Sequence, residues 1–171
     1  LPYDVSTARS AIGFSDPIVP AAVGGAARAS IADAVALLRD ARFPVILAGA
    51  RSGAPEAVAA LHELLQVTDL PVVETFQAAG IVSHDLEDHY LGRVGFARNQ
   101  PGDVLLHHAD LVLTLGYDPV EFVPAEWNLA NTRRLVHVDT ASADIDNDYR
   151  PTVELVGDLA TTLRDLTAAL L

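Results

Sequence analysis

The chain has 171 residues, of which 50% are hydrophobic and 20% charged, so it is long enough for one well-buried domain and too short for two. Its 11 basic and 23 acidic residues give a net charge of 11 − 23 = −12, which repels phosphate backbones and anionic lipids and argues against nucleic-acid or membrane partners. The absence of cysteine excludes disulfides, thiolate nucleophiles and thiolate metal sites. With no long apolar segment or signal peptide, we expect a cytoplasmic protein.

Residues 1–29 are predicted to be an extended linker from a preceding domain. The stretches "SDPIVP" and "VGGAA" are rich in proline and glycine and show little periodicity. No methionine occurs in the sequence, including at position 1, so we expect the chain to be a fragment of a longer protein. We place the globular domain at residues 30–171.

Residues 30–75 are predicted to form a helix, a strand, a second helix and a second strand. Ser30 is the predicted N-cap of the first helix, which ends near Arg42 and carries an apolar stripe. The run "PVILAG" (44–49) is typical of a strand that is buried on both faces of a parallel sheet. The stretch "RSGAPEAVAALHELLQVTD" predicts a turn and a helix, and "PVVET" predicts the next strand.

The alternation resumes after residues 76–100, which are too long for an ordinary connection and indicate a functional segment or one packed against a partner. Beyond them "PGDVLLHHA" predicts a short helix, "DLVLTLG" predicts a buried strand, and "RRLVHVD" and "TVELVG" predict two further strands. Residues 158–171 predict a final helix with Asp158 as its N-cap. The fold class is therefore α/β, a three-layer, Rossmann-like, doubly wound parallel sheet of five to six strands.

Ligands of such sheets bind beyond the carboxyl ends of the strands, so the strand-end residues are the candidates for a site. The stretch "AGARSG" follows a strand, as a phosphate loop does, but it reads G-x-x-x-G instead of G-x-G-x-x-G. Arg51 stands where a glycine would let the backbone approach a pyrophosphate, so a simple turn is favoured. Asp139 fits equally well an acceptor for a ribose hydroxyl and a helix cap or turn former.

Other chemistry has weaker support in the sequence. The histidines lack the i, i+4 spacing of a metal site, and we interpret them as surface residues: His84, His89, His107 and His108. Sequence spacing leaves a Ser-His-Asp site open, but no serine lies in a G-x-S-x-G turn, so this alternative has weak support. The aromatic residues of "GYDPVEFVPAEWN" fit a ligand wall or, more commonly, packing anchors: Tyr117, Phe122 and Trp127.

Four stretches, taken in order, carry a resemblance to a known family: "PVILAGARSG", "PVVETFQAAG", "GRVGFARNQPGDVLLHHADLVLTLGYDPVEFVPAEWN" and "LVHVDTASADIDNDYRPTVELVGD". Together they resemble the central domain of thiamine-diphosphate enzymes, and within these the catabolic acetolactate synthases. The resemblance implies a three-domain parent that condenses two pyruvate molecules into 2-acetolactate and CO2. It also implies that thiamine diphosphate and magnesium are held by the other domains, because this chain lacks the G-D-G motif. No catalytic residue, cofactor or metal is then expected in this fragment.

The biosynthetic members of that family bind FAD in this domain, and the matching positions differ here. Arg51 follows Gly49 and Ala50 where those enzymes have further glycines, and Ala97 replaces a histidine. Asp118 stands where those enzymes have an arginine. Its carboxylate is expected to repel a phosphate by roughly 4 kcal/mol at about 4 Å. The resemblance therefore implies a degenerate flavin cleft, filled in part by Tyr117 and Phe122, and an FAD-independent parent. The residues of this degenerate flavin cleft are Gly49, Arg51, Ala97, Gly116, Asp118 and Asp139.

The stretch "GRVGFARNQPGD" (92–103) has the glycines and arginines of a ligand loop, but the resemblance implies an inter-domain contact. The possible contact residues are Gln77, Arg98, Asn99, Gln100, Tyr117 and Glu121. The expected partners are the flanking N- and C-terminal domains of the same enzyme and further copies in a homo-oligomer. A solvated surface loop stays open as the alternative. Two other functions also stay open: a working FAD- or nucleotide-binding domain of another thiamine-diphosphate-dependent decarboxylase or transferase, and a free-standing structural domain.

Overall fold

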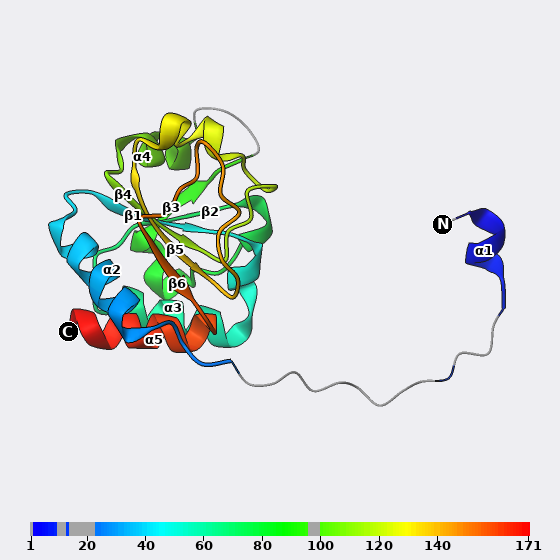
Figure 1. Ribbon diagram of the computed structural model, residues 1–171, viewed down its shortest axis with the longest axis horizontal. Helices are drawn as coiled ribbons and strands as arrows, with labels where there is room; N and C mark the ends of the chain where they lie inside the picture. Colours follow the sequence, from blue (N-terminus) through cyan, green and yellow to red (C-terminus); the bar gives the residue numbers. More distant parts are fainter. Residues whose placement is uncertain (1, 10–12, 14–22, 96–99) are drawn as a thin grey trace.

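Six strands form one parallel sheet in the order β3-β2-β1-β4-β5-β6, as Figure 1 shows for the computed structural model, which describes residues 2–9, 13, 23–95 and 100–171. The strands are β1 (Pro44–Ala48), β2 (Val72–Glu74), β3 (Tyr90–Arg93), β4 (Leu111–Leu115), β5 (Arg134–Asp139) and β6 (Val153–Val156). This order is that of a doubly wound sheet, in which the chain starts in the middle and fills first one side and then the other. The predicted fold class is confirmed.

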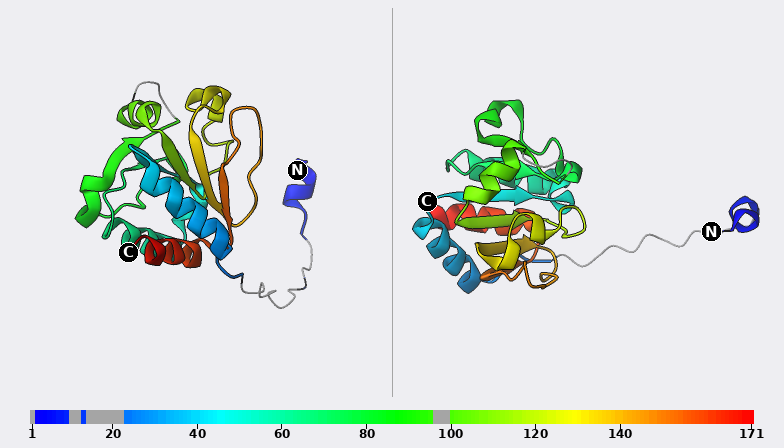
Figure 2. Two further views of the ribbon diagram at one scale, coloured as in Figure 1. Left: turned by 60° about the vertical axis from the view of Figure 1, so that its left-hand side comes forward. Right: turned by 90° about the horizontal axis from the view of Figure 1, so that it is seen from above.

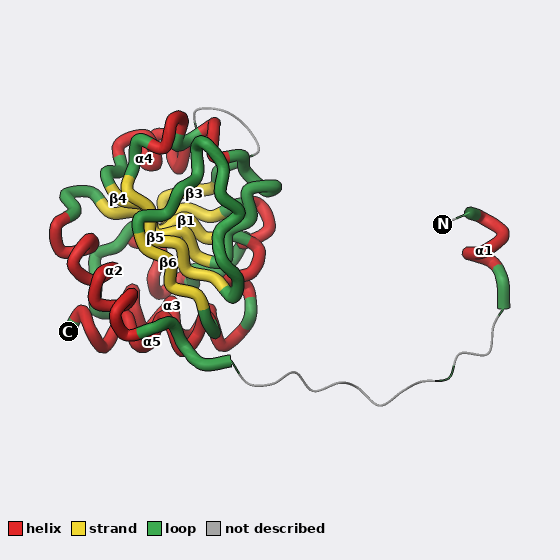
Figure 3. Tube along the Cα trace, in the orientation of Figure 1, coloured by secondary structure: helices red, strands yellow, loops and turns green. Residues whose placement is uncertain are grey.

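Helices cover both faces of the sheet, three on one side and one on the other (Figure 2). The first face carries α2 (Arg28–Asp40), α3 (Pro55–Leu65) and α5 (Leu159–Leu170), which appear in Figure 3 as the red tubes to the left of the yellow strands and below them. The opposite face carries α4 (Pro101–His108) together with the segment that contains the short 3-10 helices η4 (Pro124–Glu126) and η5 (Leu129–Asn131).

Successive side chains of the central strands enter two different cores. In β1, Ile46 and Ala48 pack with the three helices, whereas Val45 and Leu47 point to the opposite face. On that face they join a second cluster that includes Leu106 of α4. Burial on both faces explains why the strands read as continuous apolar runs in the sequence.

The packed part of the domain begins earlier than the expected boundary at residue 30. Helix α2 starts at Arg28 and its N-cap is Ala27, so Ser30 lies in its first turn and is not the N-cap. Before the helix, Gly24 O accepts a hydrogen bond from Asp158 N at 2.9 Å, and Ala26 N donates to Thr162 Oγ1 at 3.0 Å. These bonds fix the chain in place before residue 28, so a side-chain cap at Ser30 is not needed to set the start of the helix. The predicted linker also contains a short helix, α1 (Tyr3–Thr7), with no buried residues.

The long stretch at residues 76–100 contains a strand that the sequence pattern did not predict. Strand β3 pairs with β2 through Val72 and Tyr90, with a register shift before Glu74 and Arg93. Its sequence "YLGR" has no β-branched residue and an internal glycine, so neither composition nor alternation marks it. Two 3-10 helices, η2 (Phe76–Ala78) and η3 (His84–His89), occupy much of the rest.

The two predicted helices in the second half of the chain are confirmed. Helix α4 starts with Pro101, and its N-cap residue Gln100 donates its backbone N–H to the Asp103 carboxylate at 2.9 Å. Helix α5 has the predicted N-cap, because Asp158 Oδ1 accepts from Thr161 N at 2.8 Å. In the part of the chain that the structure describes, no helix is long and apolar enough to cross a lipid bilayer.

Candidate functional site at the crevice between β1 and β4

The sheet reverses its winding direction between β1 and β4, and the crevice beyond their carboxyl ends is where such folds bind ligands. Residues 49–51 follow β1, residues 116–118 follow β4, and Asp139 ends the neighbouring strand β5. The structure brings all of these described strand-end candidates together, as their mutual contacts show. Ala97 lies outside the described residues.

Glycines in the crevice allow two backbone turns to touch. A Cβ atom on Gly49 would lie 2.5 Å from Tyr117 Cα and 2.7 Å from Gly116 O. Gly116 has a φ of +56°, and a Cβ atom there would lie 2.5 Å from Ser52 N. In a dinucleotide fold such glycines let the ligand approach the backbone. In this chain they let the turn after β1 come into contact with the turn after β4, so the two turns fill the space between them.

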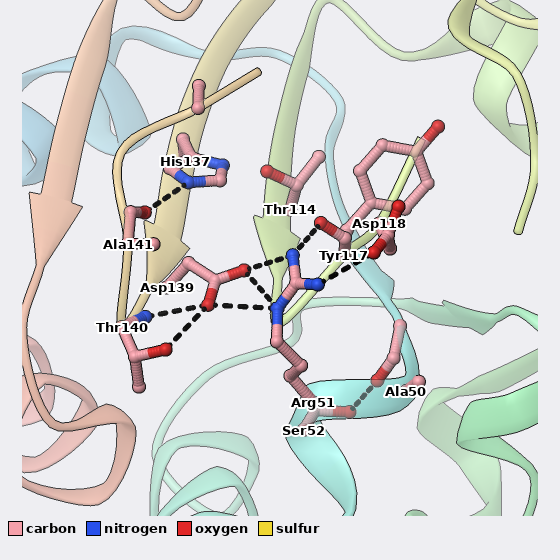
Figure 4. A network of polar contacts seen from close by, with 12 residues as sticks. Ala50, Arg51, Ser52, Thr114, Tyr117, Asp118, His137, Asp139, Thr140 and Ala141 are labelled. Atoms are coloured by element: carbon pink, nitrogen blue, oxygen red, sulfur yellow. Dashed lines mark hydrogen bonds and ion pairs between the residues drawn. The ribbon is translucent and has the colours of Figure 1, made fainter. Parts of the chain in front are cut away.

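Arg51 lies across the crevice and binds two aspartates (Figure 4). Its Nε and Nη2 donate to the Asp139 carboxylate at 2.9 and 2.7 Å, and its Nη1 donates to Asp118 Oδ2 at 2.9 Å. Nη2 also reaches the carbonyl oxygen of Tyr117 at 2.7 Å. Asp139 is 0% exposed, so the guanidinium is the cation that balances a buried anion. These contacts, the bond to Asp139 first, raise the pKa of Arg51.

The pairing of Arg51 bears on two expectations. Asp118 was expected to place a negative charge that repels a phosphate; the structure pairs this carboxylate with Arg51, and the N–H of Val120 together with Arg51 lowers its pKa. The oxygens of Asp139 accept from Arg51 and from Thr140 N, the latter at 2.6 Å, so the carboxylate holds the turn at the end of β5, as the turn-former alternative had it.

A second carboxylate, that of Glu121, closes the other side of the crevice. Its oxygens accept from Ala50 N at 3.0 and 3.2 Å, from Asp118 N at 3.3 Å and from the hydroxyl of Thr75. The donors come from the turns after β1, β4 and β2 respectively. The residue is half-buried, and the sequence analysis named it only as a possible inter-domain contact.

Comparison with known protein families matches residues 31–166 to the family described as "Thiamine pyrophosphate enzyme, central domain". The chain belongs to this family.

The similar curated proteins include several acetolactate synthases. The acetolactate synthase of Bacillus subtilis (strain 168) is 49% identical over 144 residues, which cover 84% of this chain and 25% of the relative. The catabolic acetolactate synthase of Raoultella terrigena is 39% identical over 167 residues, covering 97% of this chain and 30% of the relative. A probable acetolactate synthase large subunit of Methanococcus aeolicus is 30% identical over 142 residues, which cover 80% of this chain and 23% of the relative. The chain thus spans less than a third of the length of these relatives, and the family resemblance is confirmed.

The cavity that remains at the crevice of this central domain is small. The cavity beside Arg51 and Tyr149 measures about 260 Å³, below the range of roughly 300 to 1,000 Å³ that is usual for ligand pockets. The two turns touch each other at Gly49 and Gly116, and Arg51 bonds to Asp139 beside them. A larger apolar cavity of about 560 Å³ lies at the opposite, amino end of the strands, near Phe43 and Leu91, away from every strand-end group.

The aromatic residues of the central domain are packing anchors, as the commoner interpretation had it. Tyr117 is 1% exposed and meets Trp127 edge to face, with ring centroids 5.9 Å apart. Trp127 Nε1 donates to the Tyr117 hydroxyl at 3.2 Å, and that hydroxyl donates to Phe122 O. Burial raises the pKa of Tyr117. Phe122 packs against the same cluster, so both residues fill space next to the crevice.

A buried polar network beside the crevice was missed by the sequence analysis. The Tyr149 hydroxyl lies 2.7 Å from Thr114 Oγ1 and 2.8 Å from His137 Nδ1, and His137 Nε2 lies 3.0 Å from Ala141 O. The signal was present, because Thr114 and His137 are single polar residues inside the apolar runs "LVLTLG" and "LVHVD". Local patterns gave no indication that Tyr149 would join them.

The remaining predicted positions lie at the surface or outside the described residues. Gln77 is exposed in η2, and Gln100 is the N-cap residue of α4. Arg98 and Asn99 fall outside the described residues. The histidines are surface or structural: His84 pairs with Glu87, His89 Nδ1 contacts Leu70 O, and His107 and His108 are exposed. Among the described residues, no group of three His, Asp or Glu side chains is arranged to hold a metal ion.

Proposed function

We propose that this chain is the central domain of an acetolactate synthase of the FAD-independent, catabolic kind. The observation that carries the proposal is the 39% identity to a catabolic acetolactate synthase over 97% of the chain. The filled crevice supports the FAD-independent part, since Arg51 and Glu121 occupy the groups that a dinucleotide would need. The similar proteins do not favour the alternative of a working nucleotide-binding domain in another thiamine-dependent enzyme.

The whole protein is proposed to convert two pyruvate ions and one proton into one 2-acetolactate ion and CO2. Thiamine diphosphate, held with magnesium in the other domains, supplies the electron sink for decarboxylation and for the new carbon–carbon bond. The central domain holds no reacting group in this proposal. Its role is to position the flanking domains.

The carboxyl edge of the sheet is the proposed contact surface for those domains. Gln77 is exposed there, and the loop after β4 presents Val120, which is 89% exposed, to the outside. Arg98, Asn99 and Gln100 remain proposed contacts of the same edge. Tyr117 and Glu121 support this edge from within, because their polar atoms bond inside the domain. Assembly of the parent into a homo-oligomer and a cytoplasmic location belong to the same proposal.

The test is to express the complete gene and to assay acetolactate formation from pyruvate with thiamine diphosphate and Mg²⁺. We expect turnover by the full-length protein, no flavin absorbance in the purified enzyme, and no turnover by residues 1–171 alone. A full-length protein that makes no acetolactate, or one that needs FAD to do so, contradicts the proposal. Acetolactate formation by the fragment above the protein-free control would show that the active site is misplaced.

A further inference from the structure

The backbone N–H groups of residues 49–52, in the turn after β1, have acceptors inside the chain. Gly49 N donates to Leu115 O at 2.9 Å, Arg51 N to Gly116 O at 3.0 Å, and Ser52 N to Gly49 O at 3.0 Å. Ala50 N donates to the carboxylate of Glu121. In nucleotide-binding folds of this shape, N–H groups of this turn are the ones that face a phosphate. In this chain three of the acceptors are carbonyl groups, and the fourth is an anion.

Glu121 collects its hydrogen bonds from three different strand ends. The donors are Ala50 N after β1, the Thr75 hydroxyl after β2 and Asp118 N after β4. Thr75 is 0% exposed, so its hydroxyl depends on this carboxylate for a strong acceptor. Three convergent donors around two oxygens form the kind of arrangement that binds an oxyanion.

We propose that Glu121 is a built-in anionic ligand, which occupies an oxyanion site formed by Ala50 N–H, Thr75 Oγ–H and Asp118 N–H and keeps the crevice closed. The carboxylate is tethered only three residues from Asp118, so its effective concentration at the site far exceeds that of a free anion. An external oxyanion cannot displace it at ordinary concentrations. Without this side chain, the same donors accept a small tetrahedral oxyanion such as inorganic phosphate.

The neighbouring charges set the strength of that binding. Arg51 carries one positive charge against the two negative charges of Asp118 and Asp139, so this group has a net charge of +1 − 2 = −1. Glu121 adds a further negative charge, and a Glu121→Ala variant would lack this charge. Phosphate is therefore expected to bind the opened site weakly, in the millimolar range, because three hydrogen bonds act against one nearby net negative charge.

The experiment is a titration of inorganic phosphate into the chain, followed through the backbone amide signals in ¹H–¹⁵N NMR spectra. The proteins compared are the unchanged chain, Glu121→Ala, and Glu63→Ala as a control that removes the same charge from an exposed pair with Arg164. We expect saturable shifts of the Ala50 and Asp118 amide signals in Glu121→Ala, with at least about tenfold tighter binding than in the other two proteins. Sodium chloride at matched ionic strength should give no saturable shift.

Two outcomes overturn the proposal: no saturable shift at Ala50 in Glu121→Ala, or the same shift in the unchanged chain. If Glu121→Ala does not fold, Glu121→Gln decides, because it keeps the shape of the side chain and loses the charge. The Ala50 amide of that variant should then exchange its hydrogen about tenfold faster than in the unchanged chain, while the Leu113 amide in the sheet stays protected. Equal exchange at Ala50 in both proteins would also refute the internal-ligand role. None of these readouts depends on the reaction of the parent enzyme.

Discussion

Arg51 shows how one side chain can turn a ligand site into an internal contact. Its guanidinium bonds to a fully buried aspartate, to a half-exposed one and to a backbone carbonyl, so the ends of β1, β4 and β5 are joined at a single residue. A buried ion pair of this kind contributes little net free energy when intact, but breaking it leaves an uncompensated buried charge. Stability is therefore more sensitive to the loss of Arg51 than to the loss of a surface arginine.

We predict that Arg51→Ala lowers the free energy of unfolding by about 3 kcal/mol, because Asp139 loses its cation and stays buried. The estimate is at the lower end of the usual range, since Arg51 is itself 41% exposed and water can reach the gap. Urea unfolding measures the change. The control is Arg164→Ala, which breaks an exposed pair with Glu63 and should cost below about 1 kcal/mol. Equal losses in the two variants would contradict the prediction.

The carboxylate of Asp158 should make the stability of the chain depend on pH. Asp158 accepts bonds from the Thr161 hydroxyl and N–H, and these contacts hold its pKa below the ordinary value of about 3.9. A carboxylate whose pKa is lower in the folded state contributes stability above the unfolded-state pKa and loses it as the pH falls through the folded-state pKa. The free energy of unfolding should therefore decrease from about pH 5 towards pH 3.

The variant Asp158→Asn should show a weaker pH dependence over that range, because asparagine caps a helix about as well but does not titrate there. Urea unfolding of both proteins at pH 5, 4 and 3 provides the comparison. The two curves should converge as the pH falls. A constant difference between them at all three pH values would mean that Asp158 plays no part in the acid response.

At the scale of single elements, continuous apolar runs were a reliable guide and short mixed segments were not. The runs that became β1, β4 and β5 are buried along nearly their whole length, so their side chains had to be apolar on both faces. Strand β3 is half-exposed, and its pairing with β2 depends on tertiary contacts that leave no local pattern.

The ion pair between Arg51 and Asp139 spans 88 positions, so the sequence indicated both residues but not their contact.

The turn after β4 depends on a glycine at its first position. Gly116→Ala should lower the free energy of unfolding by more than about 2 kcal/mol or prevent folding, because a left-handed φ strains alanine and its Cβ would collide with Ser52 N. Gly53→Ala is the matched control, since a Cβ atom there meets nothing within 4 Å. That change should stay within about 1 kcal/mol of the unchanged chain in thermal unfolding. Similar behaviour of the two variants would refute the role of Gly116.

For the molecule as a whole, the strand order predicts a ligand site, whereas the contacts within the crevice do not. The strand order is that of a dinucleotide-binding sheet, yet the described residues at its ligand edge bind one another. A fold of this class hosts many functions, so the side chains at the strand ends decide what binds. Prediction from the sequence succeeded for the sheet because burial patterns are local, and it failed for the charge balance of the crevice because pairing partners are distant.

We expect the chain not to bind FAD. A titration followed by quenching of flavin fluorescence should give a straight dilution line up to about tens of micromolar, because the cavity at the strand ends measures only about 260 Å³, below the roughly 300 to 1,000 Å³ that is usual for ligand pockets. A known FAD-binding protein in the same buffer serves as the positive control. Saturation in the low-micromolar range would show that Arg51 and Glu121 move aside and that the crevice is an open site.

The contact between residues 24–26 and the start of α5 affects the order in which the domain can form. Gly24 O and Ala26 N bond to Asp158 and Thr162, and the absence of a side chain on Gly157 lets the backbone of residues 24–26 pass within 3 Å of its ideal Cβ position. A ribosome has made nearly the entire domain before these partners exist. Until then, the faces of α3 and β5 that pack against α5 stay uncovered. We therefore expect the domain to complete its fold during synthesis only after α5 has been made, and a nascent chain that ends before residue 158 to expose apolar surface of the kind that chaperones bind.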